Sequence, residues 1–177
     1  FSALPGLKNV KGDATIFGTT EAVSLQNIAL TAGGSGPVSL DIEGAVGRIP
    51  FSETEPVAAV DLTTTVAADT TKAFATAFGL KLTELGAVTG SCAFTGSSER
   101  LAVSDILLST VSAGGLKIKA AGNVTRIRPG HKQPLEGAEL TVTATAPRWA
   151  SLPGLEDTVL PDLGSIRMDA RINDRNG

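Results

Sequence analysis

Residues 85–108, LGAVTGSCAFTGSSERLAVSDILL, decide the fold of this chain. Apolar or small residues occupy every second position, a Gly-Ser-Ser-Glu turn interrupts them, and the alternation then resumes. The same pattern occurs 78 residues earlier, in 7–30 (LKNVKGDATIFGTTEAVSLQNIAL), and starts again at residue 163. Self-similarity at a fixed spacing is typical of an array of one supersecondary unit. We therefore expect a first β-repeat at 1–80, a second at 81–158 and the start of a third at 159–177, together forming one continuous array.

Each repeat contains four strand patterns and a connector. The connector of the first repeat, 69–79, has a capping acid, apolar positions four apart and a terminal glycine, which predict a short helix. The equivalent 147–154 has room for about one turn because it contains prolines. The predicted fold class is mostly β: tandem repeats of about four antiparallel strands plus a short helical connector, forming a curved, open β-groove, or alternatively a closed β-sandwich. The strand patterns run through 10–16, 23–30, 38–46 and 60–66, and through 88–94, 101–108, 116–124 and 138–144.

The second strand of each repeat carries the same irregularity. Its alternation slips by one residue across Gln26-Asn27 in the first repeat and across Ser104-Asp105 in the second. A β-bulge restores the facing of the side chains after such a slip and increases the local twist. We therefore predict a bulge at each of the two places.

Composition excludes several function classes. The net charge of −3 provides no global field that would recruit nucleic acid, and one cysteine cannot form an internal disulfide. No apolar run is long enough to span a bilayer, and no signal peptide is recognisable. Because the sequence starts at Phe1 without an initiator methionine and its third repeat is incomplete, we expect any anchoring segment to lie outside it.

Candidate catalytic residues are few. A Ser-His-Asp triad, a zinc site or a histidine base would all need His131, the single histidine, and we interpret it as a solvated loop residue. Cys92 occupies the packed phase of its strand, so we interpret it as a small core residue. We expect no catalytic residue, no metal, no cofactor and no enzymatic activity, and a hydrolase is the least favoured hypothesis. Five basic residues lie on or just after the third strand of the second repeat: Lys117, Lys119, Arg126, Arg128 and Lys132. We interpret them as part of a solvated outer face rather than as a phosphate site.

The apolar face of the strands is the remaining candidate for function. It forms either the inner wall of a closed sandwich or the lining of a curved sheet left open on one side, and alternation is the same for both. In the open case we expect it to bind lipid acyl chains through Val23, Leu25, Ile28, Leu30, Val38, Leu40, Ile42, Leu62 and Val66, and through Leu101, Val103, Ile106, Leu108, Leu116, Ile118, Leu140 and Val142.

The repeats also resemble a known family. Residues 85–108, the stretch Gly-Gly-Leu-Lys-Ile-Lys-Ala-Ala-Gly-Asn-Val at 114–124, and 135–147 with 152–155 and 160–164 are similar to the carboxy-terminal repeats of AsmA-family proteins. The second repeat matches best, and the resemblance covers most of the chain. Its motifs are patterns of β-structure rather than catalytic signatures.

The resemblance implies a periplasmic part of a protein anchored in the inner membrane of a Gram-negative envelope. Related repeats, including those of TamB-like proteins, form long β-grooves with an apolar lining and are implicated in phospholipid transport between membranes and in outer-membrane assembly. The implied partners are phospholipid or another acyl lipid, the membrane through segments absent from this sequence, and envelope proteins, with no nucleic acid. The competing hypothesis is a structural or interaction spacer of a cell-envelope or surface protein, with a closed core.

Overall fold

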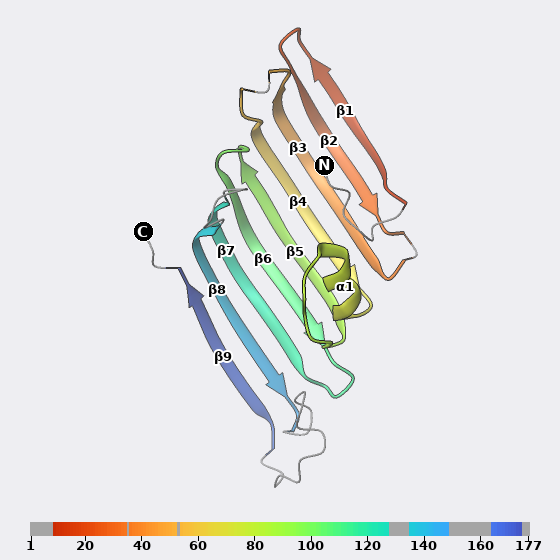
Figure 1. Cartoon of the computed structure of the whole chain (residues 1–177), viewed down its shortest axis with the longest axis vertical. Helices are drawn as coiled ribbons and strands as arrows, with labels where there is room; N and C mark the ends of the chain where they lie inside the picture. The colour runs from red at the N-terminus through yellow and green to blue at the C-terminus, as the bar shows by residue number, and fades with distance from the viewer. Residues whose placement is uncertain (1–8, 35, 53, 128–134, 149–163, 175–177) are drawn as a thin grey trace.

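The computed structural model describes residues 9–34, 36–52, 54–127, 135–148 and 164–174, and Figure 1 shows their arrangement. This part of the chain is mostly β, with a single short helix. The elements are β1 (Lys11–Gly18), β2 (Ala22–Ala32), β3 (Val38–Pro50), β4 (Ala58–Ala68), α1 (Thr71–Phe78), β5 (Ala87–Gly96), β6 (Leu101–Val111), β7 (Lys117–Ile127), β8 (Leu135–Ala146) and β9 (Ile166–Asn173).

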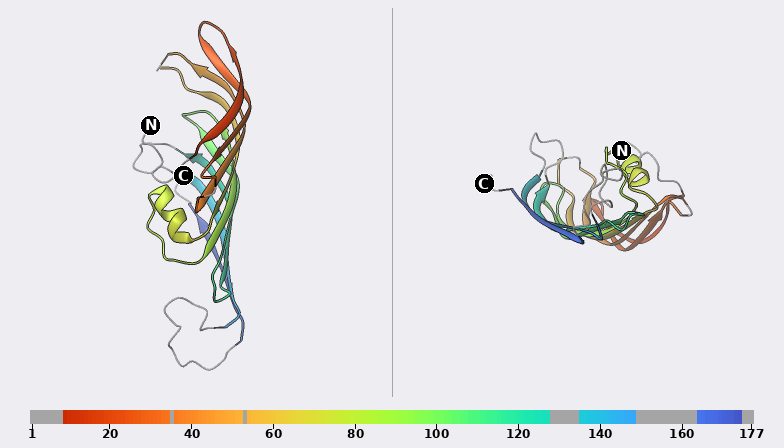
Figure 2. Two further views of the ribbon diagram at one scale, coloured as in Figure 1. Left: turned by 90° about the vertical axis from the view of Figure 1, so that its right-hand side faces the viewer. Right: turned by 90° about the horizontal axis from the view of Figure 1, so that it is seen from below.

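All nine strands form one antiparallel sheet, in which each strand pairs with its neighbours in sequence and β1 and β9 are the edges. Figure 2 shows a single curved layer with α1 on its concave side. Within the described residues no second sheet faces the first, so the closed sandwich considered from the sequence is wrong for this part of the chain. The sequence did not tell whether the strands form one sheet or two, and the described strands form one.

Both predicted bulges are present. The pairing register shows that β2 contains one residue more than β3 just before Ile28, and that β6 contains one more than β7 just before Ile106. Asn27 and Asp105, the residues preceding these two, have φ of 50° and 52°. Asparagine and aspartate tolerate this left-handed conformation better than other residues with a Cβ atom. The bulges therefore keep the apolar residues on both sides of each slip on one face.

A glycine lies opposite each bulge. Gly44 of β3 has φ of 138°, and a Cβ atom added there would lie 2.1 Å from the carbonyl oxygen of Asp61. A Cβ atom added at Gly122 of β7 would lie 1.9 Å from the carbonyl oxygen of Glu139. Only glycine fits these close backbone approaches. Bulge and glycine together increase the coiling of the strands and so favour a curved sheet.

Helix α1 begins one residue later than the sequence predicted. The hydroxyl of Thr70, which has extended backbone angles, accepts a hydrogen bond from the backbone N–H of Ala73 at 3.0 Å. The prediction of Asp69 as the capping residue is therefore wrong, and its backbone N–H donates instead to the carbonyl of Pro37. Gly79 ends the helix in the left-handed conformation, as predicted. Most of the second connector, predicted to form a turn at 147–154, lies outside the described residues.

Candidate functional site

The residues predicted to line a groove lie on one face of the sheet. Directly paired residues of antiparallel strands project to the same side, so the pairs Leu40–Val66, Val66–Gly90 and Gly90–Leu108 carry one face across four strands. Val66 packs against the cluster that α1 covers, so this is the concave face. By register, sixteen of the seventeen residues predicted to bind acyl chains lie on this concave face. The seventeenth, Leu116, precedes β7 and has no pairing register, and its side chain is buried. We call this apolar concave face, from β2 to β8, the trough.

The trough is only partly covered by protein. Leu108 is 38% exposed, and the concave residues of the edge strands are more open, with Ile16 at 66% and Met168 at 63%. No large side chain among the described residues is less than 2% exposed. The chain has 11914 Å² of accessible surface, whereas a compact protein of this mass exposes roughly 8000 Å². This excess is expected of a single-layer sheet, whose two faces both meet solvent; among the described concave residues of the inner strands, Leu108 is the one large apolar side chain that is exposed.

Helix α1 covers one end of the trough. Ala77 of the helix forms a buried cluster with Val38, Ala68 and Val88 of three strands. Phe74 and Phe78 pack against this cluster and against each other, with ring centroids 4.8 Å apart. Val38 was predicted to face a guest, but it is 5% exposed and lies under the helix of its own chain. On β3 the next concave residue, Leu40, was also predicted to face a guest but is 7% exposed, so the free lining of this strand begins at Ile42.

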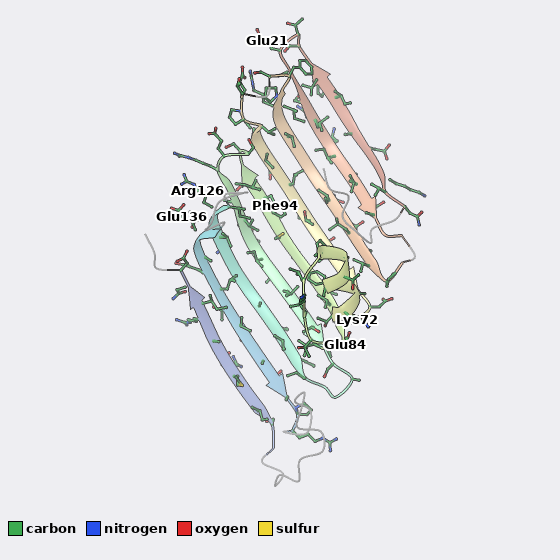
Figure 3. The ribbon with its side chains drawn as sticks, viewed as in Figure 1. Glu21, Lys72, Glu84, Phe94, Arg126 and Glu136 are labelled. Atoms are coloured by element: carbon green, nitrogen blue, oxygen red, sulfur yellow. The ribbon has the colours of Figure 1, made fainter. Side chains whose placement is uncertain are left out.

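Glu84, in the segment after α1, holds the helix in place (Figure 3). Its carboxylate accepts hydrogen bonds from the backbone N–H groups of Thr71, Lys72 and Gly86 at 3.3, 3.1 and 2.7 Å. The buried Thr71 hydroxyl donates to the carbonyl of Gly86 at 2.9 Å. The bond from Gly86 is the largest cause that lowers the pKa of Glu84. The carboxylate thus joins the two ends of the connector.

A second apolar cluster lies on β6, β7 and β8. Val103, Val124 and Ala138 form one row across the three strands, and Phe94 packs against this row (Figure 3). Cys92 also packs here and is half-buried. Loss of solvation raises the pKa of its thiol, which is the opposite of what an activated nucleophile requires. The interpretation of Cys92 as a packed residue agrees with this position, although the position is not fully buried.

The convex face is mostly polar, although Leu107 and Phe17, which lie on it by register, are 57% and 53% exposed. Lys117 and Lys119 are exposed on it and pair with Thr145 and Thr143 of β8. Arg126, which the sequence grouped with them, is instead half-buried and forms an ion pair. The remaining members of that group, Arg128 and Lys132, and also His131, lie outside the described residues.

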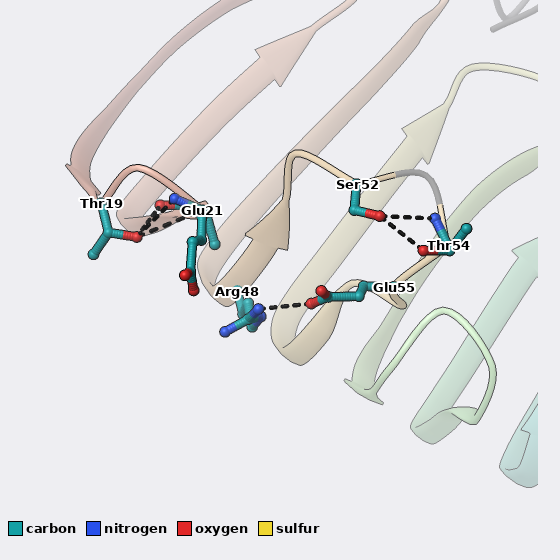
Figure 4. A network of polar contacts seen from close by, with 7 residues as sticks. Thr19, Glu21, Arg48, Ser52, Thr54 and Glu55 are labelled. Carbon is teal, nitrogen blue, oxygen red and sulfur yellow. Dashed lines mark hydrogen bonds and ion pairs between the residues drawn. The ribbon is translucent and has the colours of Figure 1, made fainter.

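Arginine–glutamate pairs occur at the strand ends that lie away from α1. Nη2 of Arg48 is 2.6 Å from Oε2 of Glu55, and Nη1 of Arg126 is 3.4 Å from Oε2 of Glu136. The two arginines are 78 residues apart, so they are equivalent in the sequence repeat. Figure 4 shows the first pair beside two turns, one with Thr19 and the other with Ser52 and Thr54, whose hydroxyl groups also form hydrogen bonds. We call these strand ends, which carry Arg48 and Arg126 and lie away from α1, the arginine rim.

The described residues contain no group of three or more His, Cys, Asp or Glu that is arranged to hold a metal ion. Among them, no helix is both long enough and apolar enough to cross a bilayer. Searches with the chain matched no family model, no curated protein and no solved structure. The resemblance to AsmA-family repeats therefore stays a prediction.

Sequence reasoning missed the residues that close or border the trough. The four-residue spacing of Phe74 and Phe78 was visible, but it does not tell which surface the helix covers. The equivalence of Arg48 and Arg126 was also visible in the repeat. Their position at one rim depends on the order of the strands in the sheet, which the repeat alone does not give.

Proposed function

We propose that this chain is a non-catalytic segment of an envelope protein and that it binds lipid acyl chains in the trough. The observation that carries the proposal is the apolar concave face, which within the described residues is covered by another layer of protein only where α1 lies. Large apolar surfaces left open in this way usually serve binding.

The physical gain comes from the hydrocarbon. Burial of an acyl chain stabilises the complex by about 0.8 kcal/mol per methylene, while the headgroup stays in water at the edge of the sheet. The sheet has only to supply a continuous apolar lining, and it needs neither a catalytic group nor a cofactor.

The wider role follows from the resemblance of the repeats to the AsmA family. In this proposal β1–β4 and β5–β8 are two copies of a four-strand unit, each with a bulge and a glycine opposite it, and β9 begins a third. The array is a periplasmic part of an inner-membrane-anchored protein. It contributes to phospholipid transport between membranes and to outer-membrane assembly.

Lipid extraction from the purified chain, followed by mass spectrometry, tests the proposal. We expect acyl lipid in the native protein and its loss in Ile118→Asp, because Ile118 is a half-buried residue of the trough. The matched control is Lys119→Asp, which places the same side chain on the convex face one residue away. Acyl lipid in none of the three proteins would favour the spacer hypothesis, and equal lipid in all three would place the binding elsewhere.

A further inference from the structure

Strand β9 is an edge strand, and no other described strand pairs with its outer side (Figure 1). The N–H of Asp174, just after β9, donates to the carbonyl of Ala138 at 2.9 Å. The backbone groups of an antiparallel strand point alternately to its two sides, and the register between β8 and β9 has no shift. The odd-numbered residues of β9 therefore direct their N–H and C=O groups away from the sheet. An edge of this kind is a template for a further strand.

The convex side chains of β9 carry charges of both signs. These four exposed residues are Arg167, Asp169, Arg171 and Asn173. At the equivalent positions the inner strand β5, which has a neighbour on each side, carries Thr89, Ser91, Ala93 and Thr95. The repeat therefore does not require charges in this row, and the edge strand differs from the inner strand by having them.

We propose that two copies of this chain associate through β9, which pairs antiparallel with β9 of the second copy about a two-fold axis at Ala170. The axis is perpendicular to the sheet, so the concave faces of both copies lie on the same side and the two sheets become one. Such an interface is isologous, because each copy offers the other the same groups. The inference does not depend on what the trough binds.

The charges select this register. With Ala170 opposite its own counterpart, Asp169 of each copy faces Arg171 of the other, and the symmetry forms this ion pair twice. The guanidinium of Arg171 is available for it, because it has no ion pair with another described residue. An axis at Asp169 or at Arg171 would instead place that residue opposite itself, and like charges directly opposite each other are destabilising.

The concave side chains fit the same register. Met168 and Ile172 are 63% and 53% exposed, and each would lie opposite the other residue in the second copy. Ala170 would form a pair without backbone hydrogen bonds, in which the side chains come closest, and its methyl group is small enough for this place. The odd-numbered residues, whose backbone groups point outward, would form the hydrogen-bonded pairs.

Sedimentation velocity of charge variants tests the partner and the edge. We expect the native chain to dimerise and Arg171→Asp to dimerise at least about tenfold more weakly, because Asp169 would then face a carboxylate. The double variant Asp169→Arg, Arg171→Asp restores the ion pair in reverse order and should restore the dimer. The matched control is Thr15→Asp, at the position of β1 equivalent to Arg171, which should dimerise as the native chain does.

A disulfide crosslink tests the register. With Cys92→Ala as the background, Ala170→Cys should link two copies under mild oxidation, because such a pair has Cα atoms about 4.5 Å apart. Met168→Cys lies away from the axis and should not form a disulfide with its own counterpart. A linked dimer with Met168→Cys and not with Ala170→Cys would overturn the register.

Three outcomes would overturn the association through β9. They are a native chain that stays monomeric, a double charge variant that keeps the native circular dichroism spectrum but does not regain the dimer, and loss of the dimer in Thr15→Asp. The last outcome would place the contact on β1 instead.

Discussion

The two apolar clusters of the sheet are buried in different ways. At the α1 end, Val38, Ala68 and Val88 lie between the sheet and a helix, so they belong to a two-layer core. In the second cluster, Val103 and Val124 are just as buried, and the described side chains that pack against the cluster belong to β5, β6 and β7. A low exposed fraction therefore does not by itself show that a second layer of protein is present. The difference separates the part of the concave face that a helix covers from the part against which, among the described residues, only neighbouring strands pack.

A carboxylate introduced under α1 or on the part of the trough away from the helix should give the largest difference in the free energy of unfolding. We expect Val88→Asp to lower the free energy of unfolding by about 4 kcal/mol, because the carboxylate would be buried between the sheet and α1. Ile118→Asp, on the half-exposed part of the trough, should cost about 1 kcal/mol. Urea denaturation followed by circular dichroism measures both. Equal losses would mean that the two regions are one sealed core.

The second contrast concerns the curvature of the uncovered region. Gly122→Ala should lower the free energy of unfolding by about 3 kcal/mol, because the new methyl group would overlap the carbonyl of Glu139. In Gly12→Ala the nearest atom to the new Cβ lies 3.3 Å away, and the cost should be below about 1 kcal/mol. Thermal unfolding of the two variants checks the difference. If Gly122→Ala is neutral, the backbone opposite the bulge does not fix the shape of the sheet.

The contact of α1 with the sheet gives a smaller effect. Phe78→Ala should cost about 2 kcal/mol, because its half-buried ring packs against both Phe74 and the cluster beneath the helix. Leu80→Ala, just after the helix, removes a side chain that is 50% exposed and should cost less than about 0.5 kcal/mol. Hydrogen exchange of the α1 amides, measured by mass spectrometry, should rise in Phe78→Ala and not in Leu80→Ala. Unchanged exchange in both variants would show that α1 is held by the connector alone.

The smallest effect is a pH dependence at the same end. The pKa of Glu84 is lowered in the folded protein, so its carboxylate stabilises the connector above the unfolded-state value near 4.5 and this contribution is lost as the pH falls through the folded-state pKa. The backbone amide signals of Thr71, Lys72 and Gly86 should titrate together below pH 4.5 in NMR spectra. Glu84→Gln should abolish this shared titration. Its persistence in the variant would assign the transition to another group.

Much of the sheet was predictable from the sequence because its signals are local. Alternation placed the strands, and the slips across Asn27 and Asp105 gave the bulges, since one extra residue in a strand returns the side chains to their face after a one-residue slip. The helix was also predicted, but its cap was misplaced, because Asp69 and Thr70 are both good capping residues and backbone angles decide between them.

The openness of the sheet was not predictable. A strand packed in a sandwich and a strand lining a trough have the same alternation, and the choice between them depends on whether a second layer meets the apolar face. The covering of Val38 by α1 was not predictable for the same reason, because the sequence of an amphipathic helix does not tell on which surface the helix packs. The candidate site thus came from the sequence as a set of residues, and its closed end and its charged rim came from the three-dimensional arrangement.

The reactivity of Cys92 tests the central claim most directly, because this native thiol lies half-buried on the concave face between Thr64 and the second cluster. The measurement is the rate of thiol modification by a water-soluble reagent in lipid-free protein and after addition of phosphatidic acid. A guest lying in the trough should slow the reaction at least about tenfold, saturably, and Ile118→Asp should remove this protection. An unchanged rate in protein that demonstrably holds lipid would contradict the account, because the acyl chain would then lie outside the trough.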